Sequence, residues 1–246
     1  GARVVVNDLD ADVGEAVAAE IRGAGGEAIA VNGSVTEPDF APRFVGAAVD
    51  RFAGLDIIVN NAGYTWDSTI QNTSDAQFQA MLDVHLVAPF RILRAAAGPL
   101  REYARAESAA GARTHRKVVN ISSIAGLFGN AGQAGYASGK AAITGLTRTL
   151  AKEWGRHAAN VNALAFGLIN TRLTQPIEEK QATIAIGDNE VKVGIQPAML
   201  DAWAAMIPLG RAGTVEEAAG AVYLLCTPEA DYISGQVIVC GGGLLV

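Results

Sequence analysis

Tyr136 and Lys140 lie four residues apart in a segment rich in small residues, a spacing that can build a proton-transfer site. Residues at positions i and i+4 share one helix face, so the phenol and the ammonium can point into the same space. A nearby ammonium lowers a tyrosine pKa from about 10, and such a tyrosine can exchange a proton with a carbonyl or an alcohol. Ser123, at the end of a strand-like segment, would supply a hydroxyl to the same oxygen. The alternative is an exposed helix with an ordinary tyrosine and lysine.

The elements around these residues must bring them to one edge of a sheet. Short apolar runs alternate with helical patterns along the whole chain. We predict strands at 4–7, 27–31, 55–60, 117–122, 160–165 and 236–240. We predict helices at 11–23, 38–53, 75–105, 136–156 and 215–226. Strands that are apolar on both faces and alternate with helices predict an α/β fold with a doubly wound parallel sheet, in a single domain over residues 1–246.

Composition argues against several classes of protein. A chain of 246 residues with 50% hydrophobic content can bury one large core. A net charge of −6 does not favour nucleic-acid or anionic-membrane partners. We find no run of 18 apolar residues and no signal-like start, so we expect no membrane span. Cys226 and Cys240 lack metal-ligand spacing, so we expect no metal site. A disulfide between them is possible but not required, and we expect a reduced, cytoplasmic setting.

Four features resemble the short-chain dehydrogenase/reductase family in order and spacing: Asn60-Asn61-Ala62-Gly63, Ser123, Tyr136 and Lys140. The resemblance extends from about residue 3 to residue 243, and Gly129–Tyr136 is typical of 3-oxoacyl-acyl-carrier-protein reductases and hydroxyacyl-CoA dehydrogenases. It implies a Rossmann-like fold and an oxidoreductase of the EC 1.1.1 type, which transfers a hydride between nicotinamide and a secondary alcohol or ketone. Tyr136 would then be the general acid/base, Lys140 would lower its pKa and bind the nicotinamide ribose, and Ser123 would hold the substrate oxygen.

The family usually has an asparagine as a fourth catalytic member, and this sequence has His85 at that position. Histidine also occurs there in hydroxyacyl-CoA dehydrogenase relatives. A neutral imidazole could still hold the proton-relay water. The alternative is a packed core histidine that is hydrogen-bonded to the backbone. His115 and His157 lie in polar segments, and we assign them no role.

The resemblance also implies a first strand and a glycine-rich phosphate loop, and neither occurs in this sequence. The chain opens on the strand at 4–7, which corresponds to the family's second strand. No Gly-x-Gly-x-x-Gly lies between a strand and a helix elsewhere. Because the missing strand is central in the family's sheet, its neighbours would have unpaired backbone groups. We therefore expect the sequence to be N-terminally truncated.

Asp8 ends the first predicted strand, where a carboxylate can accept hydrogen bonds from both hydroxyls of an adenine ribose. It would repel a 2′-phosphate, and no Arg or Lys follows at 9–12, so we expect NAD, with NADP less favoured. Asp8 or Asp10 could also simply cap the next helix, and both roles can hold at once. The resemblance implies further cofactor contacts from Ser34, Val35, Asn60, Ala62, Gly63, Tyr136, Lys140, Gly167, Ile169 and Thr171.

Two of these positions depart from the family pattern. Ser34 replaces the usual aspartate beside the adenine and loses its charge. Phe166 replaces the proline of the Pro-Gly turn beside the nicotinamide, although Gly167 is retained. After this turn Ile169 would face the nicotinamide carboxamide through its backbone, and Thr171 would lie near the cofactor's phosphates or amide.

Two connections are longer than the alternating pattern requires. Residues 104–116 predict a solvated loop. Residues 172–208 predict a substrate lid, because a segment this long inside a compact domain usually covers a binding site. Its apolar residues would bury an acyl or similar chain; the alternative is a subunit interface. They are Ile184, Ile186, Ile195, Met199, Leu200, Trp203 and Met206.

Three hypotheses for function follow. The leading one is an NAD(P)-dependent oxidoreductase for a small-molecule substrate, a 3-hydroxyacyl or 3-oxoacyl thioester. The second is a dehydrogenase of another secondary alcohol, such as a steroid, sugar or terpenoid. The third is a non-catalytic cofactor-binding sensor, which applies if the truncation is real. The small residues of the helices at 75–105 and 136–156, together with the resemblance, predict a homodimer or homotetramer.

Overall fold

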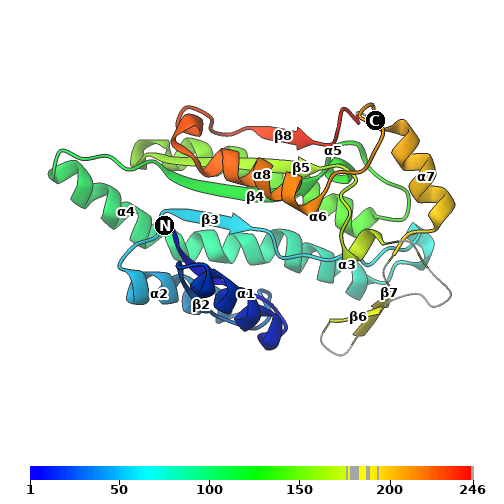
Figure 1. The fold of residues 1–246 in the computed structure, drawn as a ribbon, viewed down its shortest axis with the longest axis horizontal. Coiled ribbons are helices and arrows are strands. Elements are labelled where there is room, and N and C mark those ends of the chain that lie inside the picture. Colours follow the sequence, from blue (N-terminus) through cyan, green and yellow to red (C-terminus); the bar gives the residue numbers. More distant parts are fainter. Residues whose placement is uncertain (176, 178–182, 187–188, 193, 245–246) are drawn as a thin grey trace.

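The computed structural model describes residues 1–175, 177, 183–186, 189–192 and 194–244. Its main sheet has four parallel strands in the order β3–β4–β5–β8. These are β3 (Ile57–Asn60), β4 (Arg116–Ser123), β5 (Ala159–Phe166) and β8 (Val237–Cys240). All four run the same way, so their carboxyl ends form one edge (Figure 1).

A second parallel ladder pairs β1 (Arg3–Val6) with β2 (Glu27–Ala30). Among the described residues, no ladder joins β1 to β3. On β3, the side chains of Ile57 and Val59 remain 45% and 40% exposed. The break lies where the sequence resemblance predicts a further strand.

Helices cover both faces of the four-stranded sheet. On one face, Val118 and Val161 pack with residues of α2 (Phe40–Phe52) and α4 (Ala88–Ala109). On the other face, Val119 and Leu164 pack against Leu225 of α8 (Val215–Cys226). Because successive residues of a strand point to opposite faces, the continuously apolar strands supply both cores. The predicted α/β fold with a doubly wound parallel sheet is confirmed.

The remaining α-helices are α1 (Ala11–Gly23), α3 (Asp75–Leu82), α5 (Ile124–Phe128), α6 (Ala134–Trp154) and α7 (Pro197–Met206). Helices α1 and α6 follow the predicted ranges closely, whereas α5 and α7 are not among the predicted helices. The helix predicted at 75–105 is α3 and α4 joined by a π-helical turn at Asp83–Val87. The loop predicted at 104–116 is wrong in its first part, because α4 continues to Ala109. Alanine is the strongest helix former, and it recurs through this last turn.

The segment 172–208 contains an antiparallel hairpin, β6 (Thr183–Ile186) and β7 (Asn189–Lys192), followed by α7. Figure 1 shows both at the end of the molecule toward which the strands of the main sheet point. Leu168, Ile207 and Leu244 form a buried cluster there. Ile195, Leu200 and Trp203 pack against it. The side chains of Ile184 and Ile186 lie outside the described part of the chain.

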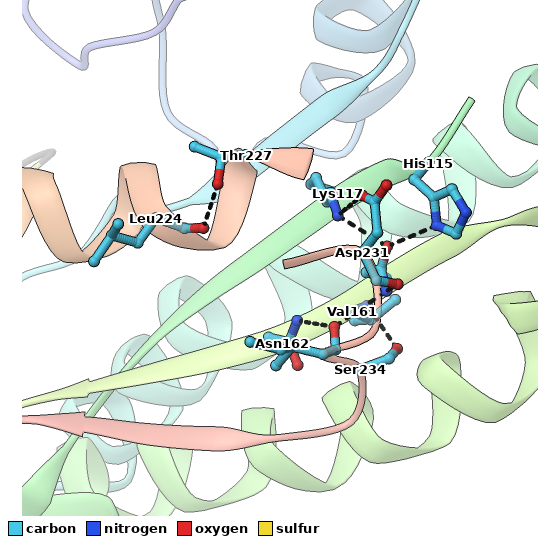
Figure 2. A network of polar contacts seen from close by, with 10 residues as sticks. His115, Lys117, Val161, Asn162, Leu224, Thr227, Asp231 and Ser234 are labelled. Carbon is cyan, nitrogen blue, oxygen red and sulfur yellow. Dashed lines mark hydrogen bonds and ion pairs between the residues drawn. The ribbon is translucent and has the colours of Figure 1, made fainter. Parts of the chain in front are cut away.

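A buried polar network fixes the opposite, amino edge of the sheet (Figure 2). The Lys117 ammonium is 3% exposed and donates to Asp231 at 2.5 Å and to the Asn160 side-chain oxygen at 3.1 Å. Asn160 in turn donates to the backbone oxygens of Asp231 and Ile233. The network therefore connects β4, β5 and the loop that precedes β8.

Two negative findings concern the described part of the chain. There, no helix combines the length and the apolar character that crossing a bilayer requires. Nor do His, Cys, Asp and Glu side chains gather there in a group of three able to hold a metal ion. Cys226 and Cys240 are free, and partial burial raises the pKa of both thiols.

Candidate active site

Helix α6 carries Tyr136 and Lys140, and polar side chains fix it to the sheet. Asn60 donates to Asn120 at 2.7 Å, and Asn120 donates to the Thr147 hydroxyl on α6 at 2.9 Å. Ser122 donates to the Lys140 carbonyl at 2.6 Å. These contacts set the depth and rotation of α6 relative to β3 and β4.

A close backbone contact brings α6 against α5. A Cβ on Gly126 would meet the Lys140 carbonyl carbon at 2.5 Å, a distance that real side chains do not reach. Gly126 therefore lets the first turns of α6 approach the end of β4. Ser123 ends β4 and caps α5, where its hydroxyl accepts from the Ala125 amide at 3.2 Å. Ser123, Tyr136 and Lys140 are thus brought together, as the sequence spacing predicts.

Lys140 is deeply buried, with its ammonium 5.7 Å from the centre of the Tyr136 ring. The ammonium donates to the Ile121 carbonyl at 2.8 Å. Burial disfavours the charged form and lowers the pKa of Lys140 to about 7. Near neutral pH, the lysine can therefore both give and take a proton.

The prediction that the pKa of Tyr136 is lowered is wrong. Burial raises the pKa of Tyr136, the Ser123 hydroxyl lowers it, and the Asp67 carboxylate raises it further. Sequence spacing revealed the lysine but not the depth of burial, which penalises phenolate and ammonium alike. Tyr136 is therefore a neutral phenol at neutral pH, the form that can donate a proton.

His85 lies in the π-helical turn with its ring edge-on to the Tyr136 ring, at 90° and 5.0 Å between centres. Its Nε2 is 2.8 Å from the Tyr64 carbonyl oxygen. Because a carbonyl only accepts, Nε2 must carry the proton, and Nδ1 presents a lone pair. Nδ1 is buried and has no hydrogen-bond partner among the described residues. Burial, then the Lys140 charge, hold the pKa of His85 well below its ordinary value, so the ring is neutral.

Two glycines make room for this imidazole. A Cβ on Gly63 would lie 2.5 Å from Cε1 of His85, and one on Gly139 would lie 2.9 Å from its Cβ. The ring is thus held between the loop after β3 and one face of α6. Both sequence interpretations of His85 describe part of this geometry: it is a packed histidine bonded to backbone, and it also touches Tyr136.

Sequence reasoning missed a contact that closes the site from the other side. Gln133 donates to the Asp67 carboxylate at 2.8 Å, and the Ser68 amide donates to the Gly132 carbonyl at 2.8 Å. Burial raises the pKa of Asp67, while the Gln133 amide lowers it. Nothing about Asp67 in the sequence distinguishes it from any other loop carboxylate, because its partner lies 66 residues away.

Comparisons with known proteins identify the family of the chain. A family model described as "Enoyl-(Acyl carrier protein) reductase" matches residues 1–245. A 3-oxoacyl-[acyl-carrier-protein] reductase from Synechocystis is 33% identical, with 100% of this chain and 88% of the relative covered. One from Vibrio cholerae is 30% identical, covering 98% and 86%. The chain belongs to the short-chain dehydrogenase/reductase family. It is an oxidoreductase of the EC 1.1.1 type.

A solved structure of this family has the same fold. It is a gluconate 5-dehydrogenase from Burkholderia cenocepacia in complex with NADP and tartrate, with a TM-score of 0.82 and 26% identity. The match covers 99% of this chain and 86% of the other. Family membership implies NAD(P) as cofactor and a small-molecule substrate.

The residues expected to hold the adenine end of the cofactor lie at the carboxyl ends of β1 and β2. The cap of α1 is Asp10, whose carboxylate accepts from the Asp12 and Val13 amides. Asp8 is not the cap, and among the described residues its carboxylate accepts only from the Asp10 amide, at 2.9 Å. The Ser34 hydroxyl contacts Thr36 at 2.7 Å, and Val35 packs against the core.

The residues expected on the nicotinamide side follow β3 and β5. Asn61, Ala62 and Gly63 are exposed at the carboxyl edge, so the backbone there is open to a ligand. A Cβ on Gly167 would lie 2.8 Å from Cα of Gly241, which explains why the glycine is kept although Phe166 replaces proline.

Beyond this turn, Ile169 and Thr171 are largely engaged within the protein. The Ile169 carbonyl accepts from the Thr174 hydroxyl at 2.6 Å. Thr171 caps a short helix at Arg172–Thr174. Of the residues expected to contact the cofactor, Ala62 and Gly63 leave their backbone open, whereas the Ile169 carbonyl and Thr171 already have hydrogen-bond partners within the chain.

Proposed function

We propose that the protein is an NAD-preferring oxidoreductase that interconverts 3-oxoacyl and 3-hydroxyacyl thioesters. One observation carries the proposal: a partly buried, neutral Tyr136 touches His85 and lies beside Ser123 and Lys140. A phenol so placed serves as the acid of a ketone reduction and, as phenolate, as the base of the reverse reaction. The named relatives act on 3-oxoacyl groups, which supports the substrate class.

In the reductive direction, the bound nicotinamide would supply the hydride to the carbonyl carbon. The Tyr136 hydroxyl donates its proton to the carbonyl oxygen as negative charge develops there. Ser123 donates a hydrogen bond to the same oxygen and stabilises that charge. Lys140 can restore the proton to Tyr136, because burial brings the pKa of the ammonium to about 7.

His85 is the positioning residue of this relay. Its Nδ1 lone pair is buried without a partner among the described residues, and the Lys140 charge is close enough to lower the pKa of the ring, so Nδ1 can accept a hydrogen bond from a donor of the relay. An asparagine could supply an oxygen acceptor there, and the Nε2-protonated imidazole supplies a nitrogen acceptor instead. His115 has no part in this relay, because it contacts Asn160 at the opposite edge of the sheet.

The preference for NAD rests on Asp8. Its carboxylate lies at the carboxyl end of β1, has no ion pair among the described residues and would oppose a 2′-phosphate. The related gluconate 5-dehydrogenase is named with NADP. Titrating NADH and NADPH against the protein and its Asp8→Ala variant measures the ratio of the two binding affinities and tests this preference. Tighter NADPH binding by the unmodified protein would contradict it, whereas a narrowed preference in the variant would support it.

The acyl chain would lie under residues 172–208, next to the turn at Gly167. Ile195, Leu200 and Trp203 cover the cluster beside this turn, and Met199 and Met206 are 48% and 54% exposed. Exposed methionines are adaptable apolar surface for a flexible chain. Replacing Trp203 and Met206 by alanine should raise KM for long-chain thioesters more than for acetoacetyl-CoA.

A second candidate substrate, a sugar acid or other polyol, is favoured by Asp67. This carboxylate is close enough to Tyr136 to raise its pKa, and carboxylates accept hydrogen bonds from substrate hydroxyls. The structural relative is named as a gluconate 5-dehydrogenase. Assaying NADH oxidation with acetoacetyl-CoA and with 5-ketogluconate separates the two. A kcat/KM higher for the ketogluconate would overturn the thioester assignment, and activity with neither would favour a cofactor-binding sensor.

We also propose that the protein assembles as a homodimer or homotetramer. Large apolar side chains stay exposed on α8 and in the loop before β8, including Tyr223 at 69%, Leu224 at 66% and Tyr232 at 104%. A second copy related by two-fold symmetry would cover this surface.

A further inference from the structure

A cavity of about 460 Å³ opens between α4 and the end of α6, at the amino edge of the sheet and away from the candidate active site. Trp154, 8% exposed, is among its walls. Basic side chains dominate the remainder of the lining. The lining residues are Ala97, Arg101, Lys152, Glu153, Trp154, Arg156 and His157.

The cations around this cavity outnumber the carboxylates that could pair with them. Arg101, Lys152 and Arg156 line it and are exposed, against one carboxylate, Glu153. None of the three cations forms an ion pair with another described residue, whereas Arg22, Arg116 and Arg211 do. The end of helix α6 contributes about half a negative charge, which offsets only part of this excess. The chain as a whole has a net charge of −6, so this cluster of positive charge is confined to the cavity.

His157 responds to this concentration of charge. Partial burial first, and then the charges of Arg156, Arg101 and Arg105, lower the pKa of His157. Arg105 does not line the cavity, yet its charge reaches the imidazole. Nε2 of His157 also accepts from Nε of Arg156 at 3.2 Å. The charges of Arg101 and Arg105 on α4 and of Arg156 in the turn after α6 thus act on the same imidazole.

We propose that this cavity binds a phosphate group, carried by free inorganic phosphates or by a small phosphorylated metabolite. Arginine pairs with phosphate oxygens in a bidentate manner, and two arginines with one lysine match a doubly charged group. The volume admits a ligand of several heavy atoms beyond the phosphate, which suits the metabolite as well as the free anion. The site is separate from the proposed hydride transfer and does not depend on it.

His157 provides a readout that does not require activity. The chain has three histidines, so selectively labelled imidazole signals can be assigned with a His157→Gln variant. Each of inorganic pyrophosphate and glycerol 3-phosphate is titrated at constant ionic strength, with sodium sulfate as a charge control. Neutralising the surrounding guanidinium groups should raise the pKa of His157 by about half a unit or more at saturation.

Matched variants decide whether the cavity is responsible. Arg101→Gln with Arg156→Gln should weaken pyrophosphate binding by about tenfold or more. Arg94→Gln removes the same type of charge from the exposed face of α4 outside the cavity and should leave binding within about twofold. Tighter binding of glycerol 3-phosphate than of pyrophosphate would identify a metabolite site, and the reverse a site for free anions. No shift of His157 up to millimolar anion, an equal response to sulfate, or an equal loss in Arg94→Gln would overturn the proposal.

Discussion

Replacing Lys140 with methionine should make folding stability less dependent on pH, because the folded protein buries this ammonium at a large cost. Burial lowers the pKa of Lys140 from 10.5 to about 7. At about 1.4 kcal/mol for each pH unit, that difference corresponds to roughly 5 kcal/mol against the charged form in the folded state.

The sign follows from proton binding in the two states. Between about pH 7 and pH 10.5 the unfolded lysine holds its proton and the folded one has released it. Because the unfolded state then binds more protons, the free energy of unfolding rises with pH in this window. Below pH 7 Lys140 is protonated in both states, so the full cost of burying the ammonium applies. Above about pH 10.5 it is protonated in neither state, and this cost is absent. The wild type should therefore gain up to about 1.4 kcal/mol per pH unit relative to Lys140→Met.

Urea unfolding of both proteins at pH 7, 8, 9 and 10 measures this difference. Methionine also removes the hydrogen bond to the Ile121 carbonyl, at a cost of about 1–3 kcal/mol. That cost is the same at each pH. It therefore shifts the difference in free energy of unfolding between the two proteins by a constant and does not change the slope of this difference against pH. Lys152→Met removes an exposed lysine from the same helix and is the control. A difference between wild type and Lys140→Met that stays flat from pH 7 to pH 10 would refute the reasoning.

Three further predictions concern the site and the assembly. Tyr136→Phe should cut turnover by about 10²–10⁴-fold while the fold survives, since it removes the proton donor; steady-state rates within tenfold of the parent would exclude this role. Gly63→Ala should displace His85, because its Cβ would lie 2.5 Å from the imidazole, and should lower kcat more than Ala62→Gly, its control in the same loop; equal rates in both variants would count against positioning by His85. Sedimentation at micromolar concentration should show a dimer or tetramer, which Tyr223→Glu with Leu224→Glu on α8 should weaken; a lone monomer in the parent would contradict the proposed assembly.

The strands and most helices could be predicted because apolar periodicity records which faces are buried. Six predicted strands correspond to β1, β2, β3, β4, β5 and β8 within a few residues. The π-helical turn at Asp83–Val87 could not be predicted, since neither glycine nor proline marks it. The hairpin of β6 and β7 also went unpredicted, because a two-stranded pair outside the main sheet need not be apolar on both faces.

The candidate site was found where residues that act together are close in sequence or carried by a family pattern. Ser123, Tyr136, Lys140 and His85 meet as expected. Asp67 and Gln133 were missed, because their contact joins two loops that the pattern does not mark. Spacing indicates which side chains share a helix face; it does not indicate which loops the fold brings together.

Burial, which spacing cannot report, decides the chemistry at the centre of the site. A lysine beside a tyrosine in water would lower the phenol pKa, as the sequence alone predicts. In this fold, desolvation raises the pKa of Tyr136 and lowers that of Lys140. Near neutral pH Tyr136 is thus a phenol and Lys140 is divided between ammonium and amine, and the neutral His85 beside them adds an acceptor without adding charge. Release of the Lys140 proton avoids the large cost of burying an isolated ion. The neutral Tyr136 phenol supplies a proton donor for the oxygen of a ketone.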